Sequence, residues 1–556
     1  MSAAAAGGRG ASPPGFSPWV GRLGAVVLAA AVLWLLVPFA GTDPPAGLTA
    51  SNATWTDEGF NLANARERVL VGRFATGDID RSLTNGAYSA LAAGLFAVTG
   101  PSLAAGRVLS MVALAGAVLL LALGLARPLG RLPALLAGAA LGGADLMLEH
   151  GRLALVEATV VVLLAGAFAL AVRAAWRPTP LAGVGLGLLL AAAVSVKATA
   201  LLPAVAMLAV ILAAAARRRD RPALAMGLAA AASASLAAVA WLLAVALPNW
   251  ERLRTAVRVW PRVDYLDDPL AIAGRLGRYL ADSDQAVGRS LPLLLAAAVG
   301  LAVLVGRWRR LWPAARDALV IAAAWGIGLW LVVAVGDYLP GHYLAPNRYV
   351  VPALPGLAVL AGFGLASVAA AAGGRGPVSA GNPPGPRSTG GQTRPAGAGQ
   401  GRTALAGVVL GLAVAVPGVA TYLDGALHSG RVREADQRRL AAAVADDAVV
   451  YGAYAPTLLF DTRLATLTPW PSAGANVRDP VGRLGVTHVL VGNGPADPTG
   501  QVPAIVEQGD GDLLARVPWG GQELALYALA PGAHVDVSPV TPASGYDPGA
   551  DRSRRT

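Results

Sequence analysis

The sequence predicts an all-α polytopic membrane protein with a small C-terminal α/β domain outside the membrane. Three observations support this: 55% of the 556 residues are apolar, only 14% are charged, and long apolar runs alternate with short arginine-containing turns. Soluble domains carry about 25% charged residues, so the composition excludes a soluble globular protein. The net charge of +11 does not indicate nucleic-acid binding, because the basic residues separate apolar runs instead of forming one stripe with interleaved aromatic residues.

Cysteine, histidine and lysine are unusually distributed. Cysteine is absent, which excludes disulfides, thiolate metal sites and a cysteine nucleophile. The five histidines do not have the spacing of metal ligands. No cofactor is therefore predicted, and the sequence gives no support for a divalent metal. Lysine occurs once, at Lys197, while arginine supplies all the other basic residues.

About eleven apolar runs are long enough to cross a bilayer as helices, for which about 20 residues are needed. They are rich in Leu, Val and Ala and cover residues 22–40, 106–126, 132–148, 153–172, 180–196, 199–216, 222–247, 290–306, 318–336, 349–372 and 403–422. The shorter apolar segment 86–99 is predicted to be an interfacial or re-entrant helix, because a further crossing there would disrupt the charge distribution between the two sides.

Arginine counting orients the chain, since cytoplasmic loops of membrane proteins are enriched in Lys and Arg. With the N-terminal tail (1–21) in the cytoplasm, the arginine-rich turns fall on that side, and the first outer loop (42–105) falls on the other. The outer loop 248–289 is also arginine-rich, but long loops cross largely regardless of charge. The first apolar run exceeds a signal-peptide core in length and is predicted to remain as an anchor.

The remaining segments complete the domain organisation. Residues 22–372 form the predicted membrane domain, and the Gly-, Pro- and Ser-rich stretch 373–402 is predicted to be a disordered cytoplasmic linker before the last span, 403–422. Residues 423–533 are predicted to form the outer α/β domain, followed by a disordered tail (534–556). The predicted strands of the α/β domain cover 449–451, 488–491, 513–517 and 524–529, and the domain lacks a glycine-rich phosphate-binding motif.

Two adjacent carboxylates, Asp57 and Glu58, follow Thr56 in the first outer loop. Thr56 could begin a helix whose first turn the two acids stabilise. Alternatively, one acid could take a proton from an acceptor hydroxyl while the other positions that acceptor. The spacing alone leaves both interpretations open.

Further charged residues flank the middle spans on the predicted outer side. Glu149 shares a helix face with Asp145, and Arg152 and Glu157 follow, either as an interfacial cluster or as part of a functional site, since ionisable groups at membrane depth are costly. Lys197 lies between two spans. A snorkelling cation could equally be arginine, whereas the compact ammonium of lysine binds phosphate as a point charge, so Lys197 is predicted to bind phosphate.

A fourth outer group precedes the span 349–372. Arg348 could bind a lipid phosphate and Tyr349 could lie at the headgroup level, although an ordinary cationic and aromatic belt is the alternative. His342, nearby, could be structural. The loop 248–289 could lie on anionic lipid or form a mobile lid. Together the outer carboxylates and cations suit a phosphate-bearing membrane lipid that reacts with an acceptor on that side.

These motifs resemble, in order, those of the GT-C membrane glycosyltransferases, specifically the protein mannosyltransferase and lipid A aminoarabinose transferase type (glycosyltransferase family 39 and relatives). The matching pieces are Asp57-Glu58-Gly59 and residues 151–157, 196–203 and 347–355. The resemblance implies a many-helix fold with a catalytic first outer loop. It also implies inverting transfer of a sugar from a polyprenyl-phosphate donor to a protein, lipid or glycan acceptor at the outer face.

The resemblance implies residue roles as well. Asp57 would be the general base, Glu58 would help to bind the acceptor, and the donor phosphate would be bound by Lys197, Arg348 and Tyr349. Arg152 and Glu157 would support the site, with Glu149 and His342 as further candidates. The usual His- or Tyr-Pro-Pro element after the first loop is replaced by LTNGAY at 83–88, which leaves the sugar and the acceptor open. A lipid or polysaccharide transporter and a non-catalytic envelope assembly protein are the alternatives.

Overall fold

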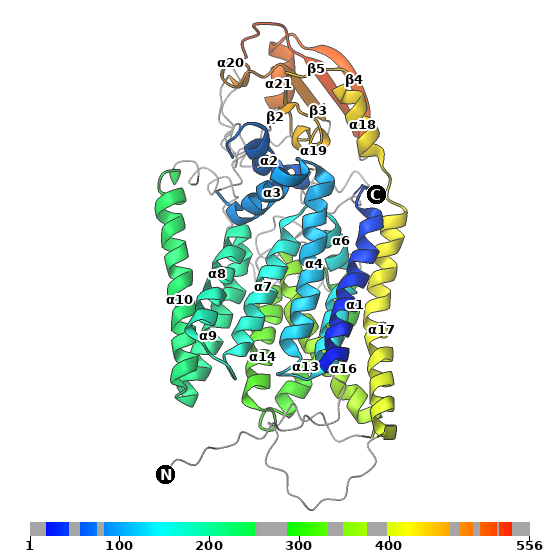
Figure 1. Cartoon of the computed structure of the whole chain (residues 1–556). Coiled ribbons are helices and arrows are strands. Elements are labelled where there is room, and N and C mark those ends of the chain that lie inside the picture. Colours follow the sequence, from blue (N-terminus) through cyan, green and yellow to red (C-terminus); the bar gives the residue numbers. More distant parts are fainter. Residues whose placement is uncertain are drawn as a thin grey trace, which may run out of the picture.

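The computed structural model describes residues 18–43, 56–74, 83–250, 253, 286–331, 349–374, 397–467, 479–492, 501–519 and 522–535. Outside these residues lie most of the loop 248–289, most of the linker 373–402, nearly all of both predicted tails, and the candidates His342 and Arg348. The described chain forms a bundle of long helices with a five-stranded sheet at one end (Figure 1). We call that end of the bundle the sheet end.

Each run predicted as a span is mostly helical in its described part. Nine helical segments among the described residues are long and apolar enough to cross a membrane, so the chain is a multi-pass membrane protein. They are built on α1 (Pro18–Leu36), α4 (Leu103–Leu125), α7 (Val156–Arg173), α9 (Leu201–Arg218), α10 (Arg221–Trp241), α13 (Ala286–Gly306), α14 (Pro313–Ala323), α16 (Leu354–Ala372) and α17 (Gly397–Leu427).

Two predicted spans are not among these nine segments. The run predicted at 132–148 is not one continuous helix, because α5 (Arg131–Gly142) and α6 (Asp145–Arg152) meet at 61°. Counted as one broken crossing, the pair gives a tenth span among the described residues. A side chain at Gly143 would meet Ala415 of α17, so the bend needs a glycine where α17 packs against it. α8 (Pro180–Val196) has only 17 residues, because the backbone is extended at Lys197.

α2 (Thr56–Leu70) and α3 (Gly86–Thr99) lie between the bundle and the sheet (Figure 1). The segment predicted to form a short apolar helix at 86–99 is α3, and its 14 residues are fewer than a span needs. The hydroxyl of Ser102 then caps α4 by accepting a hydrogen bond from the Ala105 amide, 3.1 Å away. The described parts of residues 42–105 therefore form a helical layer at the sheet end.

The C-terminal part is a small α/β domain, as predicted. Its strands are β1 (Val449–Tyr451), β2 (Ala465–Leu467), β3 (His488–Gly492), β4 (Asp512–Trp519) and β5 (Gln522–Ala528), in the order β2-β1-β3-β5-β4. β1 pairs in parallel with β2 and β3, and β5 pairs antiparallel with β3 and β4. The sequence prediction missed β2, which has three residues. Among the described residues, four helices accompany the sheet: α18 (Val432–Ala441), α19 (Ala455–Leu458), α20 (Pro480–Leu484) and α21 (Gln501–Gln508).

Candidate functional site

Glu58 is buried in a bidentate ion pair with Arg107 of α4. The Arg107 Nε and Nη2 atoms donate to Glu58 Oε1 and Oε2 at 2.8 and 2.7 Å, and the Ala154 amide donates to Oε1 at 2.7 Å. Burial raises the pKa of Glu58, but the charge of Arg107 and these hydrogen bonds together outweigh it and hold the pKa below its ordinary value. Glu58 is therefore a carboxylate that ties α2 to α4 and to the link between α6 and α7.

Asp57 occupies the preceding position of α2 but a different environment. It is partly exposed, whereas Glu58 is only 2% exposed. Successive helical residues point about 100° apart, so the two acids cannot share one partner on one face. Asn61 lies four residues after Asp57, on the same face of α2, and its Oδ1 accepts a hydrogen bond from Asn85 Nδ2 at 3.2 Å. The structure thus separates the acids that the sequence presents as a pair.

Lys197, Glu157 and Tyr349 come together from three separate motifs. The Lys197 Nζ atom lies 2.7 Å from Glu157 Oε1 and 4.5 Å from the centroid of the Tyr349 ring. The Lys197 side chain is 12% exposed and that of Glu157 is 2% exposed. An ion pair and a cation–π contact therefore hold the ammonium group of Lys197 at a fixed place beside the break between α8 and α9.

The first turn of α3 connects this cluster to α2. The Ala87 amide donates to the hydroxyl of Ser195, two residues before Lys197, at 3.2 Å, while Asn85 contacts Asn61 on α2. Tyr88 is fully buried and lies within electrostatic range of both Glu58 and Glu157. The start of α3 therefore joins the helix that carries Asp57 to the cluster around Lys197.

The other described candidates, Arg152 and Glu149, contact different partners. Arg152 donates to the Thr42 hydroxyl and, at 3.3 Å, to the Thr42 carbonyl after α1. Glu149 and Asp145 share a face of α6, as predicted, and both bind Arg289 of α13 at 2.6 Å. These contacts anchor α6 to its neighbours. No group of three His, Asp or Glu side chains within the described ranges is arranged to hold a metal ion.

Arg107 and Arg289 are site residues that the sequence analysis did not single out. Both stand at the start of an apolar helix, where a charged group is costly without a partner. That cost is a signal that could have identified them. Spacing could not have identified their partners, because Glu58 lies 49 residues from Arg107 and Glu149 lies 140 residues from Arg289 in the sequence.

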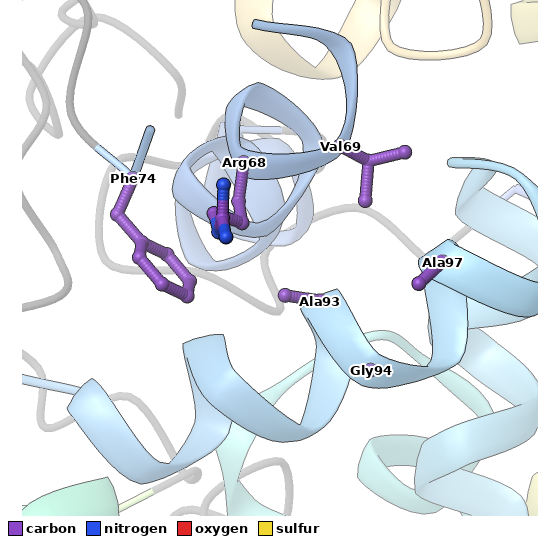
Figure 2. A pocket seen from close by; sticks show the side chains of 6 residues that line it. All are labelled: Arg68, Val69, Phe74, Ala93, Gly94 and Ala97. Carbon is purple, nitrogen blue, oxygen red and sulfur yellow. The ribbon is translucent and has the colours of Figure 1, made fainter. Parts of the chain in front are cut away.

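An open groove of about 470 Å³ lies between α2 and α3 (Figure 2). It is lined by Arg68, Val69, Phe74, Ala93, Gly94 and Ala97. The guanidinium group of Arg68 lies 5.9 Å from the centroid of the Phe74 ring and donates to the Gly72 carbonyl. The groove is thus apolar with one cation, and none of the predicted site residues lines it.

No protein-family model and no curated protein sequence matches the chain. Solved structures do match it. ArnT from Cupriavidus metallidurans bound to undecaprenyl phosphate has a TM-score of 0.57 and 17% identity, over 93% of this chain and 99% of ArnT. The apo state of the same protein has a TM-score of 0.55 and 17% identity, over 92% and 98%. The apo form of the oligosaccharyltransferase from Archaeoglobus fulgidus has a TM-score of 0.51 and 12% identity, over 88% of this chain and 71% of the oligosaccharyltransferase. The chain therefore has the fold of the GT-C membrane glycosyltransferases, which its ordered motifs resemble.

Proposed function

We propose that this protein is an inverting glycosyltransferase that moves a sugar from a polyprenyl-phosphate carrier to an acceptor at the sheet end of the membrane domain. The observation that carries the proposal is the cluster of Lys197, Glu157 and Tyr349, which α3 connects to the helix of Asp57. This arrangement would offer the Lys197 ammonium to a phosphate and the Asp57 carboxylate to an acceptor hydroxyl. The fold shared with ArnT, which was crystallised with undecaprenyl phosphate, supports the same class of donor.

Lys197 is the proposed donor-side group. Its ammonium would bind the phosphate of the carrier lipid, and Arg348, adjacent to Tyr349 in the sequence, would be a second ligand. When the bond between the sugar carbon and the phosphate oxygen breaks, negative charge grows on the leaving phosphate. Fixed cations offset that charge in the transition state.

Asp57 is the proposed acceptor-side group. Its carboxylate would take the proton of the acceptor hydroxyl as the hydroxyl oxygen attacks the sugar carbon from the face opposite the phosphate, which inverts that carbon. Glu58 receives a different role from the one that the resemblance implies. Since three hydrogen bonds occupy its carboxylate, we assign Glu58 to holding α2 and not to binding the acceptor.

The proposed orientation follows the arginine distribution. The N-terminus and the arginine-rich turns would be cytoplasmic, whereas α2, α3 and the sheet domain would face the outer side. The carrier lipid would then present its phosphate at the outer membrane–water interface, and a protein, lipid or glycan would be the acceptor.

Glycan and glycolipid profiling of a deletion strain tests this function. We expect the deletion to remove a sugar from an envelope product, wild type to restore it, and Asp57→Asn to insert in the membrane normally without restoring it. Asp446→Asn, in an exposed turn of the sheet domain, serves as the matched control and should restore the product. Full restoration by Asp57→Asn would exclude Asp57 as the base, and an unchanged profile in the deletion strain would contradict the proposed function.

A further inference from the structure

Residues 455–464 of the sheet domain, between β1 and β2, contact α2 directly; we call them the docking segment. The fully buried Thr457 accepts a hydrogen bond at its Oγ1 from the Gly59 amide, 2.9 Å away. Gly59 is the fourth residue of α2, and the first four amides of a helix need acceptors from outside it. The sheet domain therefore supplies a capping acceptor to α2 across 398 residues of sequence.

The contact at Gly59 leaves no room for a side chain. A Cβ atom there would stand 2.5 Å from the carbonyl group of Pro456 and would also clash with the Thr457 hydroxyl. The backbones of Gly59 and Pro456 are therefore in direct contact, in the first turn of α2. Because Asp57 lies two residues before Gly59, the contact fixes the turn that carries the proposed base.

Arg66 extends the same contact along α2. Its Nε atom donates to the Phe460 carbonyl at 3.0 Å, and its Nη2 atom donates to the Thr462 and Leu464 carbonyls at 2.7 Å each. The side chain is 4% exposed, and burial lowers the pKa of Arg66 to about 10. The planar donor fork of arginine suits several acceptors at once, so Arg66 binds three carbonyls of the docking segment.

Asp461 of the docking segment joins this contact to the bundle. Its Oδ1 accepts from the Leu103 amide at the start of α4, at 2.7 Å, and its Oδ2 accepts from Arg433 Nη1 of α18, at 2.9 Å. α4 also carries Arg107, the partner of Glu58. α2 is thus held from the bundle through Glu58 and from the sheet domain through Gly59 and Arg66.

We propose that the docking segment positions α2 for sugar transfer, so that the sheet domain sets the orientation of Asp57. Thr457 and Arg66 are positioning residues, which act through α2 and do not touch the substrate. The inference rests on the proposed function, in which Asp57 takes the acceptor proton. The expected effect is large, because a displacement of about 1 Å at a reacting group can lower a rate about 100-fold.

A pair of substitutions at Thr457 tests the inference in the full-length protein. Thr457→Val keeps the shape of the side chain but removes the acceptor for the Gly59 amide, whereas Thr457→Ser keeps a hydroxyl. The control is Thr487→Val, which removes a hydroxyl that bonds to Val449 inside the sheet domain. Three quantities are measured: amide hydrogen exchange of residues 57–70, affinity for undecaprenyl phosphate in nanodiscs, and the envelope product in the complemented deletion strain at equal expression.

We expect Thr457→Val to speed exchange of the first-turn amides of α2 about tenfold and to lower the product about tenfold. Its affinity for undecaprenyl phosphate should stay within twofold of wild type, and Thr457→Ser and Thr487→Val should match wild type in all three measurements. Unchanged exchange in Thr457→Val would overturn the docking, and faster exchange with an unchanged product would overturn the positioning role. An unaltered product in the deletion strain itself would overturn the proposed function, while the exchange data still decide whether the docking segment orders α2.

Discussion

Lys197 carries an ion pair and a cation–π contact at the place where we propose that the donor phosphate binds. Its ammonium group has three donors; one donates to Glu157, and the nitrogen lies 4.5 Å from the centroid of the Tyr349 ring. The carboxylate of Glu157 fixes the ammonium, but it also places a negative charge next to the proposed phosphate site. The two members of this ion pair should therefore affect phosphate binding with opposite signs.

Substitution of each member separately tests that expectation. Lys197→Met should lower the affinity for undecaprenyl phosphate roughly tenfold or more, because the cation is lost. Glu157→Gln should raise the affinity by roughly three- to tenfold, because it removes a nearby like charge and keeps an oxygen that can accept from Lys197. Binding is measured in nanodiscs of neutral lipid, with Arg221→Ala, an exposed cation, as the control. A loss of affinity in Glu157→Gln would show that the carboxylate assists binding.

At the scale of elements, the Glu58–Arg107 ion pair ties α2 to α4. Both side chains are at most 2% exposed, and removal of one member of a buried pair costs about 3–5 kcal/mol because the other charge is left without a partner. We expect Glu58→Gln and Arg107→Met each to lower the thermal midpoint in detergent strongly, and the double variant to lower it less than the sum. Additive losses would contradict a direct pairing.

The same pair predicts a pH dependence of stability. The folded-state pKa of Glu58 lies below the ordinary value of 4.5, so its stabilising contribution is full above about that pH and is lost as the pH falls through the lower folded value. Burial raises the pKa of Asp43, so Asp43 changes the stability with pH in the opposite direction. The pH dependence of wild-type stability therefore does not isolate the contribution of Glu58. The difference in thermal midpoint between wild type and Glu58→Gln should shrink below pH 4.5. A difference that grows on acidification would contradict the lowered pKa.

The sequence predicted the features that depend on local composition better than those that depend on distant parts of the chain. Apolar runs and the short helix at 86–99 follow from composition and length. The short helix is confirmed, and nine described segments, or ten with the bent pair, have the length and composition of spans where eleven were predicted. Lys197 stood out because it is the only lysine, and its three-residue cluster joins motifs that the sequence had indicated. The bend at Gly143, the short strand β2 and the contact of Arg66 with residues 460–464 depend on chain segments far away in the sequence. Nothing local in the sequence encodes such partners.

At the scale of the whole molecule, α17 connects the membrane domain to the sheet domain. Figure 1 shows it running along the edge of the bundle toward α18. Along its length α17 packs against α5, α6, α13 and α16, and the Tyr422 ring meets the Phe39 ring edge-on at 6.0 Å between centroids. The docking segment adds contacts to α2 and α4. The C-terminal part should therefore stay bound when the chain between α16 and α17 is cut.

A protease site inserted between residues 384 and 385, within the predicted linker, tests both this association and the proposed orientation. After cleavage, the fragment that begins with α17 should copurify with the rest of the protein and retain undecaprenyl phosphate binding, because the helix and the docking segment hold it at two separate places. Cleavage should occur in inside-out vesicles and not in intact spheroplasts, since the arginine distribution places this segment in the cytoplasm. Dissociation of the fragments would contradict the association, and cleavage only in spheroplasts would reverse the orientation. An uncleaved insertion at the same position controls for the effect of the added residues.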